Sequence, residues 1–131
     1  MTGFSEETLD HFQSPRNVGV LKNPDGVGTA GKPGEGHFMV FYVRVRGETL
    51  TEVSFQTFGC PAAIACGSLL TEQAKGRSIE EAMGISEREI LDGLGGLPLG
   101  KRKNAGMALA ALHGAIDDCR RKRGSGKEQC P

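Results

Sequence analysis

The sequence predicts an α+β fold in which a small antiparallel sheet is packed by helices. Two neighbouring stretches, 37–46 and 49–58, alternate between apolar and polar residues as strands do, and a short glycine-containing turn separates them. Serine residues followed by acidic residues mark several helix starts on both sides of this hairpin. A chain of 131 residues is long enough for one hydrophobic core without disulfide bonds.

The first part of the chain predicts one helix followed by a long loop. Ser5 precedes two acidic residues, a pattern that caps a helix and complements its dipole, and the helix should end near Gln13 because Pro15 follows. The stretch 15–36 contains many glycines and prolines, so we expect a loop there, with one short strand near Val27.

The hairpin provides the sheet. In each of its stretches alternate side chains share one face: Phe41, Val43 and Val45 in the first, and Val53, Phe55 and Thr57 in the second. Gly47 and Glu48 form the predicted turn between them. The pattern therefore predicts two antiparallel strands, to which the short strand near Val27 adds a third.

Helical patterns follow the hairpin. Pro61 suits the first position of a helix, and Gly76 suits its C-terminal end. Two capping boxes, each a serine with a glutamate three residues later, begin short helices at Ser78 and Ser86.

The C-terminal part predicts one long helix, over about 101–121, after a glycine-rich turn at 93–99. We expect residues 1–121 to form a single domain and residues 122–131 to form a flexible basic tail.

The composition excludes several classes of function. The chain has 16 basic and 16 acidic residues, so no net field attracts nucleic acid or an anionic membrane. We expect a cytoplasmic protein, because no stretch is apolar over the length of a membrane span and the N-terminus lacks a signal segment. In a reducing compartment the four cysteines are not a disulfide framework, and without a Cys-x-x-Cys pair they do not indicate a structural zinc site.

Five stretches, in order between Leu9 and Ile116, resemble the IscU/NifU-type iron–sulfur cluster scaffold family. They read DHFQSPRNVGVL, DGVGTAGKP, the strand with Met39 and Tyr42, TFGCPAAIACGSLLTEQAKG and GGLPLGK. The resemblance implies a three-stranded antiparallel sheet packed by helices on one side, in the IscU/NifU scaffold-like topology. It also implies a part in iron–sulfur cluster assembly, as a scaffold and not as an enzyme.

The family's cluster ligands are only partly present in this chain. Its second ligand cysteine matches Cys60, whereas its Cys-Gly-Asp pattern and its His-Cys pair read Glu35-Gly36-His37 and Lys103-Asn104 here. Lys103 and Asn104 are therefore degenerate ligand positions. Since an iron–sulfur cluster normally needs four protein ligands, mostly thiolates, we do not expect a stable cluster in the isolated monomer.

The family's chaperone-binding string, Leu-Pro-Pro-Val-Lys, reads LPLGK at 97–101. Leu97, Pro98 and Lys101 match it and are the candidate residues for partner docking. The changes at Leu99 and Gly100 weigh against recognition by the usual chaperone. A cysteine desulfurase is the other partner that the resemblance implies.

Cys60 is the residue on which the functional prediction depends. It lies at the start of the helix predicted from Pro61, where free amide groups and the helix dipole favour a thiolate. A thiolate there would serve as a metal ligand or as a sulfur acceptor. An inert, half-buried side chain is the commoner role of a cysteine.

Glu35 and His37 are two residues apart, so in an extended backbone both side chains point to one face. With Cys60 they form a candidate three-ligand site for a single iron or zinc ion. Lys103 would repel a cation there but would pair with Glu35, and Asn104 would hydrogen-bond where the family has a thiolate. The simpler alternative is that Glu35 and His37 are solvent-facing loop residues.

The sequence thus predicts a divergent iron–sulfur assembly protein that binds iron or another metal through Cys60, His37 and Glu35. The alternatives are a metal-free persulfide carrier that uses Cys60, and a non-catalytic partner-binding module that has lost the site. We expect Cys66 to lie in the core and His11 to have a packing role.

Overall fold

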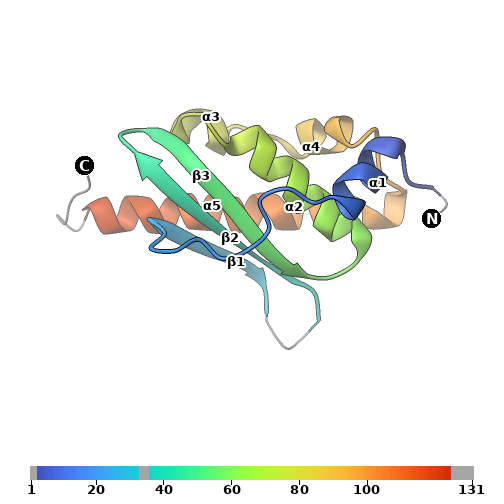
Figure 1. Ribbon diagram of the computed structural model, residues 1–131, viewed down its shortest axis with the longest axis horizontal. Coiled ribbons are helices and arrows are strands. Elements are labelled where there is room, and N and C mark those ends of the chain that lie inside the picture. Colours follow the sequence, from blue (N-terminus) through green and yellow to red (C-terminus); the bar gives the residue numbers. More distant parts are fainter. Residues whose placement is uncertain (1–2, 33–35, 125–131) are drawn as a thin grey trace.

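The computed structural model describes residues 3–32 and 36–124. Its elements follow the chain in this order: α1 (Glu6–Gln13), β1 (Gly26–Gly31), β2 (Phe38–Arg46), β3 (Thr49–Phe58), α2 (Pro61–Ala74), α3 (Ile79–Met83), α4 (Glu87–Gly93), the 3-10 helix η1 (Leu99–Lys101) and α5 (Lys103–Gly124). The strands form one antiparallel sheet in the order β1-β2-β3. Figure 1 shows α5 behind this sheet and α1 beside the start of α2. The predicted α+β fold is confirmed.

The strand register places one face of the sheet against the helices. Phe41 of β2 lies opposite Gly28 of β1 and Phe55 of β3, and its ring stacks on that of Phe55 with the centroids 5.7 Å apart. The buried side chains of this face are Met39, Phe41, Val43, Val45, Leu50, Val53 and Phe55. Full burial of a large apolar side chain contributes about 1.5–3 kcal/mol, so this face is the main source of stability in the sheet.

α5 lies directly on β1 because β1 has glycine where it faces the helix. A Cβ atom at Gly28 would collide with the α5 backbone at Ala111 and Ala115. The Asp118 carboxylate of α5 also accepts a hydrogen bond of 3.0 Å from the Val27 N–H, so the helix covers this edge of the sheet. This contact positions α5, whose first turn contains two of the candidate site residues, Lys103 and Asn104.

The loop between α1 and β1 crosses in front of the sheet (Figure 1). At one end it pairs with the outer edge of β3: the Gly19 N–H donates to the Phe55 carbonyl (2.8 Å), and the Phe55 N–H donates to the Asn17 carbonyl (3.0 Å). At the other end the Asp25 N–H donates to the Val43 carbonyl (2.8 Å). The predicted loop therefore protects the second edge of the sheet.

Most of the predicted helix boundaries are confirmed. Ser5 caps α1, Pro61 begins α2, and both capping boxes are present. The last helix differs from the prediction, because it begins at Lys103 after η1 and continues to Gly124 instead of ending near residue 121. Its last turn contains three basic residues, which the C-terminal end of a helix dipole favours. Residues 125–131 of the predicted tail lie outside the described residues.

None of the helices in the described residues combines the length and the apolar character that crossing a bilayer requires.

Candidate functional site

Cys60 is the N-cap residue of α2, as the sequence predicted. Its backbone is extended, and its carbonyl accepts hydrogen bonds from the N–H groups of Ala63 (2.9 Å) and Ile64 (3.2 Å). Within the described residues the Cys60 side chain makes no capping hydrogen bond, and it is half-buried. The sulfur is therefore not used by the helix that it precedes and remains available to a ligand.

Asn104 brings the first turn of α5 to this sulfur. Its side chain is 1% exposed, and its Nδ2 donates to the Lys101 carbonyl over 2.9 Å and to the Cys60 Sγ over 3.7 Å. Its Oδ1 is buried and has no hydrogen-bond partner among the residues that the structure describes. The amide nitrogen therefore lies beside the sulfur of Cys60.

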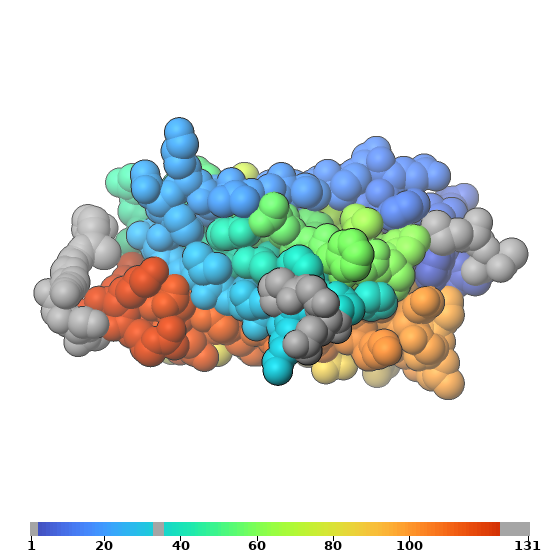
Figure 2. Space-filling view, turned by 90° about the horizontal axis from the view of Figure 1, so that it is seen from below, coloured from blue at the N-terminus to red at the C-terminus, as the bar shows by residue number. Residues whose placement is uncertain are grey.

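His37 lies next to the short connection between β3 and α2 that contains Cys60. The Cγ of its exposed imidazole ring is 3.6 Å from the position that a Cβ atom would take at Gly59, the residue before Cys60. Figure 2, the view from below, shows the three segments near one another: cyan around residue 40, green around 60 and orange around 100. Histidine and cysteine are therefore brought to one end of the sheet together with Asn104.

Glu35, the third residue of the predicted ligand set, lies outside the described residues. Its pairing with His37 and its ion pair with Lys103 stay predictions. In residues 3–32 and 36–124 no group of three or more histidine, cysteine, aspartate or glutamate residues is arranged to hold a metal ion. Of the three predicted ligands, Cys60 and His37 lie in the described part of the chain, and their role as ligands stays a prediction.

The residues predicted for partner docking differ in exposure. Leu97 is 5% exposed and packs in the core, whereas Leu99 is 78% exposed. Pro98 and Lys101 are half-buried, and Lys103 is exposed at the first position of α5. A partner that binds this segment in its folded state would therefore contact Leu99, Pro98 and Lys101 rather than Leu97.

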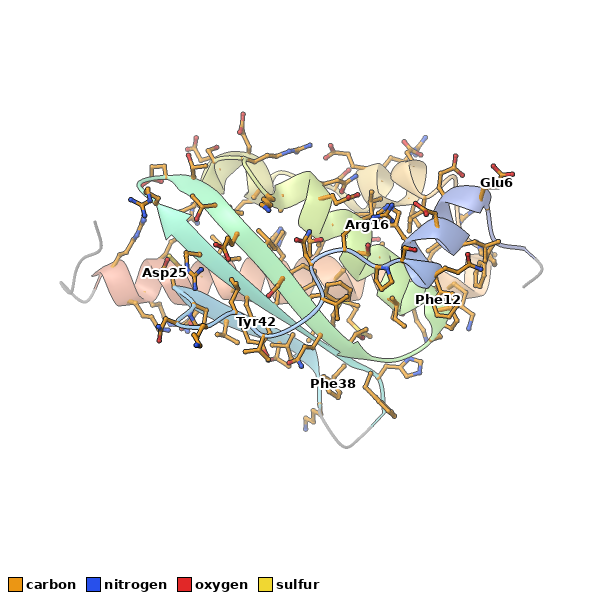
Figure 3. All side chains as sticks on the ribbon, viewed as in Figure 1. Glu6, Phe12, Arg16, Asp25, Phe38 and Tyr42 are labelled. Atoms are coloured by element: carbon orange, nitrogen blue, oxygen red, sulfur yellow. The ribbon has the colours of Figure 1, made fainter. Side chains whose placement is uncertain are left out.

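Two aromatic rings next to the site were missed in the sequence analysis. Phe58 lies two residues before Cys60 and is 66% exposed, and its ring stacks on that of Phe38 with the centroids 6.3 Å apart. Figure 3 labels Phe38 at the end of the sheet near the β1–β2 connection. Because Phe38 and Phe58 are paired in the register, strand alternation would have placed both on the face opposite Phe41. They form an apolar surface beside Cys60.

Cys66 and His11, which the sequence analysis assigned to the core and to a packing role, are both buried. Cys66 is fully buried, and burial, together with the nearby Cys60, raises the pKa of its thiol to about 12. His11 joins α1 to α2 through a contact of 2.7 Å between its Nδ1 and the Ser68 Oγ, which also accepts a hydrogen bond from the Arg16 N–H. Figure 3 labels Arg16 at this junction. Burial and the Arg16 guanidinium lower the pKa of His11, so the neutral ring is favoured.

Known proteins are similar to the chain over most of its length. The iron–sulfur cluster assembly scaffold protein IscU 1 of Archaeoglobus fulgidus is 47% identical over 121 residues, which cover 92% of this chain and 79% of that protein. The iron–sulfur cluster assembly scaffold protein IscU of Escherichia coli (strain K12) is 40% identical over 124 residues, which cover 92% of this chain and 96% of that protein.

A solved structure shows the same fold. The N-terminal part of a nitrogen-fixing NifU-like protein from Brucella abortus has a TM-score of 0.63 at 18% identity, and the match covers 94% of this chain and 95% of that one. Residues 3–125 match the family described as the NifU-like N terminal domain. The resemblance found in the sequence is therefore confirmed: this chain belongs to the NifU-like N-terminal domain family.

Proposed function

We propose that this chain takes part in iron–sulfur cluster assembly as a scaffold-like protein that holds iron, its cargo, around Cys60. The scaffold role is supported by the names of relatives that are 40% and 47% identical and by the family of the chain. One observation carries the site: the Cys60 sulfur, unused by α2, lies 3.7 Å from the buried amide nitrogen of Asn104.

The ligands near Cys60 suit one metal ion. A thiolate from Cys60, the imidazole of His37 and the carboxylate of Glu35 would be an acceptable set for ferrous iron or zinc. They would be a poor set for a cluster, which normally needs four ligands that are mostly thiolates. The proposed cargo is therefore a single ion, and no stable cluster is expected in the isolated monomer.

A cysteine desulfurase is the proposed partner. Assembly needs sulfur as well as iron, and a donor has to place its sulfur close to Cys60. Two large apolar side chains are exposed at this end of the molecule: Phe58 is 66% exposed and Leu99 is 78% exposed. They support docking of the desulfurase beside Cys60, because apolar surface that is buried in a complex contributes to affinity.

A metal-free persulfide carrier is the second candidate. It is favoured by the position of Cys60 at the start of α2, where helix amides and the Asn104 Nδ2 would stabilise a negative sulfur. The Cys60 thiolate would attack the terminal sulfur of a donor persulfide, forming a new S–S bond and releasing the donor thiolate. No metal takes part in this exchange.

Anaerobic metal titration separates the two candidates. The full chain is titrated with ferrous iron and with zinc, and its iron and sulfide content and visible absorption are measured after purification. Cys60→Ser and His37→Ala should each reduce the affinity at least about tenfold, about 1.4 kcal/mol, whereas Cys119→Ser serves as the control on α5. Unchanged affinity in both site variants would remove these residues from the metal site. Stoichiometric iron and sulfide with cluster absorption in the monomer would contradict the single-ion proposal.

The persulfide candidate has its own measurement. Intact-mass analysis after incubation with a desulfurase and cysteine should show one added sulfur atom on Cys60 if the chain carries persulfide. Metal binding without this adduct supports the first candidate, and the adduct without metal binding supports the second.

A further inference from the structure

Two hydroxyl groups bond the first turn of α1 to the turn that follows α4. The Leu94 carbonyl accepts a hydrogen bond from the Ser5 Oγ and another, over 3.0 Å, from the Thr8 Oγ1. Thr8 is fully buried. A Cβ atom at Gly95 would lie 3.0 Å from the Ser5 Cβ, so α1 lies directly against this turn. We call the contacts of Leu94 and Gly95 with Ser5 and Thr8 the latch.

The residues before α1 lie beside the predicted docking segment, 97–101. A Cβ atom at Gly3 would lie 3.4 Å from the Pro98 Cγ, which is an ordinary contact distance. Figure 1 shows α1 at the same end of the molecule as the orange segment around residue 100. While the latch is closed, the N-terminal segment therefore covers one side of Pro98, which is half-buried.

The chain is bonded to the body of the molecule again directly after α1. The Arg16 N–H donates a hydrogen bond to the Ser68 Oγ over 2.9 Å. Asn17 joins α2 and β3, because its Nδ2 donates to the Thr71 Oγ1 (3.0 Å) and its carbonyl accepts from the Phe55 N–H (3.0 Å). We call residues 16 and 17 the anchor. The anchor holds one end of α1 in place whether or not the latch is closed.

Between the latch and the anchor, α1 contributes no apolar side chain to the buried core. Its buried residues are Thr8 and His11, and both are polar. Leu9 and Phe12 are half-buried and do not belong to the core cluster, whereas Phe4, before the helix, is partly buried and packs on that cluster. Polar groups that separate can bond to water instead, so each hydrogen bond contributes little net stability. α1 should therefore separate far more readily than the elements of the apolar core.

We propose that α1 is a hinged strap over the docking segment. The latch opens, α1 turns about the anchor, and the side of Pro98 that Gly3 covers becomes accessible to a partner. The inference rests on the proposed function, since it assumes that a partner docks at 97–101, but the opening itself requires neither iron nor Cys60. A partner that binds the uncovered side competes with α1, so each weakens the binding of the other by the same factor.

Hydrogen–deuterium exchange of the full chain, measured by mass spectrometry, tests the strap. The peptides compared cover 3–13, 94–101 and β2, the central strand of the sheet. Ser5→Asp keeps a residue that caps α1 but replaces the donor with an acceptor, which the Leu94 carbonyl repels. Thr8→Val keeps the size of the side chain and removes the second donor. Ser78→Asp is the matched control, because it makes the same change at the cap of α3.

In the unmodified chain, we expect 3–13 and 94–101 to exchange faster than β2, because the strap opens while the sheet stays folded. Ser5→Asp and Thr8→Val should each speed exchange in both stretches about fivefold, the effect of losing one ordinary hydrogen bond, and leave β2 unchanged. Ser78→Asp should leave 3–13 and 94–101 unchanged. Circular dichroism checks the folding of each variant, and if Ser5→Asp does not fold, Thr8→Val decides.

Two results would overturn the inference. If 3–13 exchanges as slowly as β2 in the unmodified chain, α1 separates only when the whole fold unfolds. If the latch variants speed exchange in 3–13 but not in 94–101, α1 does not cover the docking segment. Iron titration of the unmodified chain decides the proposed function separately, because the exchange measurement contains no metal.

Discussion

Replacing Gly28 with alanine tests how α5 is held against the sheet. The new Cβ would lie 2.6 Å from the carbonyl carbon of Gly114, with backbone atoms of Ala111 and Ala115 closer still, whereas ordinary contact begins at 3.4 Å. The strand and the helix would therefore have to separate by at least about 0.8 Å, the difference between these two distances. Because the opposing atoms are all backbone, no side chain can rotate to make room.

The expected loss of stability follows from this overlap. Overpacking typically costs about 1–3 kcal/mol, and we expect about 3 kcal/mol here because backbone lies on both sides of the contact. At about 4 °C per kcal/mol for a chain of this size, Tm should fall by about 12 °C. Urea unfolding followed by circular dichroism gives the free energy, and a thermal scan gives Tm.

Gly100→Ala is the matched control, because a Cβ atom there meets nothing within 4 Å. Its free energy of unfolding should stay within about 0.5 kcal/mol of the wild type. If Gly28→Ala were as stable as this control, α5 could not pack on β1 as described. The position of Asn104 beside Cys60 would then lose its structural basis.

Three further predictions concern pH, cysteine reactivity and helix capping. Burial lowers the pKa of His11 in the folded state, so as the pH decreases the unfolded chain takes up the imidazole proton before the folded chain does. The free energy of unfolding should therefore fall as the pH decreases below about 6.5, the ordinary pKa of histidine, and should level off below the pKa of His11 in the folded state. His11→Gln should lose this part of the slope in urea unfolding, and an unchanged slope would contradict the assignment. Iodoacetamide at neutral pH should label Cys60 well before Cys66, whose pKa is raised to about 12 by burial, and peptide mapping that shows equal rates would refute the difference in exposure. Ser86→Ala should cost about 1 kcal/mol because it removes one half of the capping box of α4, and a change below about 0.3 kcal/mol would mean that this cap contributes little.

The sequence by itself determined the local structure and the family. Strand faces depend on a period of two, so Phe41 and Phe55 could be assigned to the core from alternation alone. Helix starts depend on caps a few residues long, and Ser5, Ser78 and Ser86 all cap as predicted. The family followed from short strings in a set order, which needs no knowledge of contacts between them.

Two features could not be derived from the residues of the segments alone, for different reasons. Leu97 and Leu99 belong to the same short string, yet one is buried and the other is 78% exposed, because the chain turns through η1 between the core and α5. α5 continues to Gly124 because the helix dipole favours the basic residues of its last turn. This effect is local but weak, and a charged segment that contains glycine is just as typical of a chain end without a helix.

The meeting of Asn104 with Cys60 was decided by tertiary structure. These residues are 44 positions apart, and an analogy with the family could suggest their proximity but not the direction of the amide or its unpaired oxygen. Both depend on the position of α5, which in turn depends on the absence of a side chain at Gly28 on another element. A contact of this kind arises from steric fit between backbones distant in the chain, and local propensities contain no information about it.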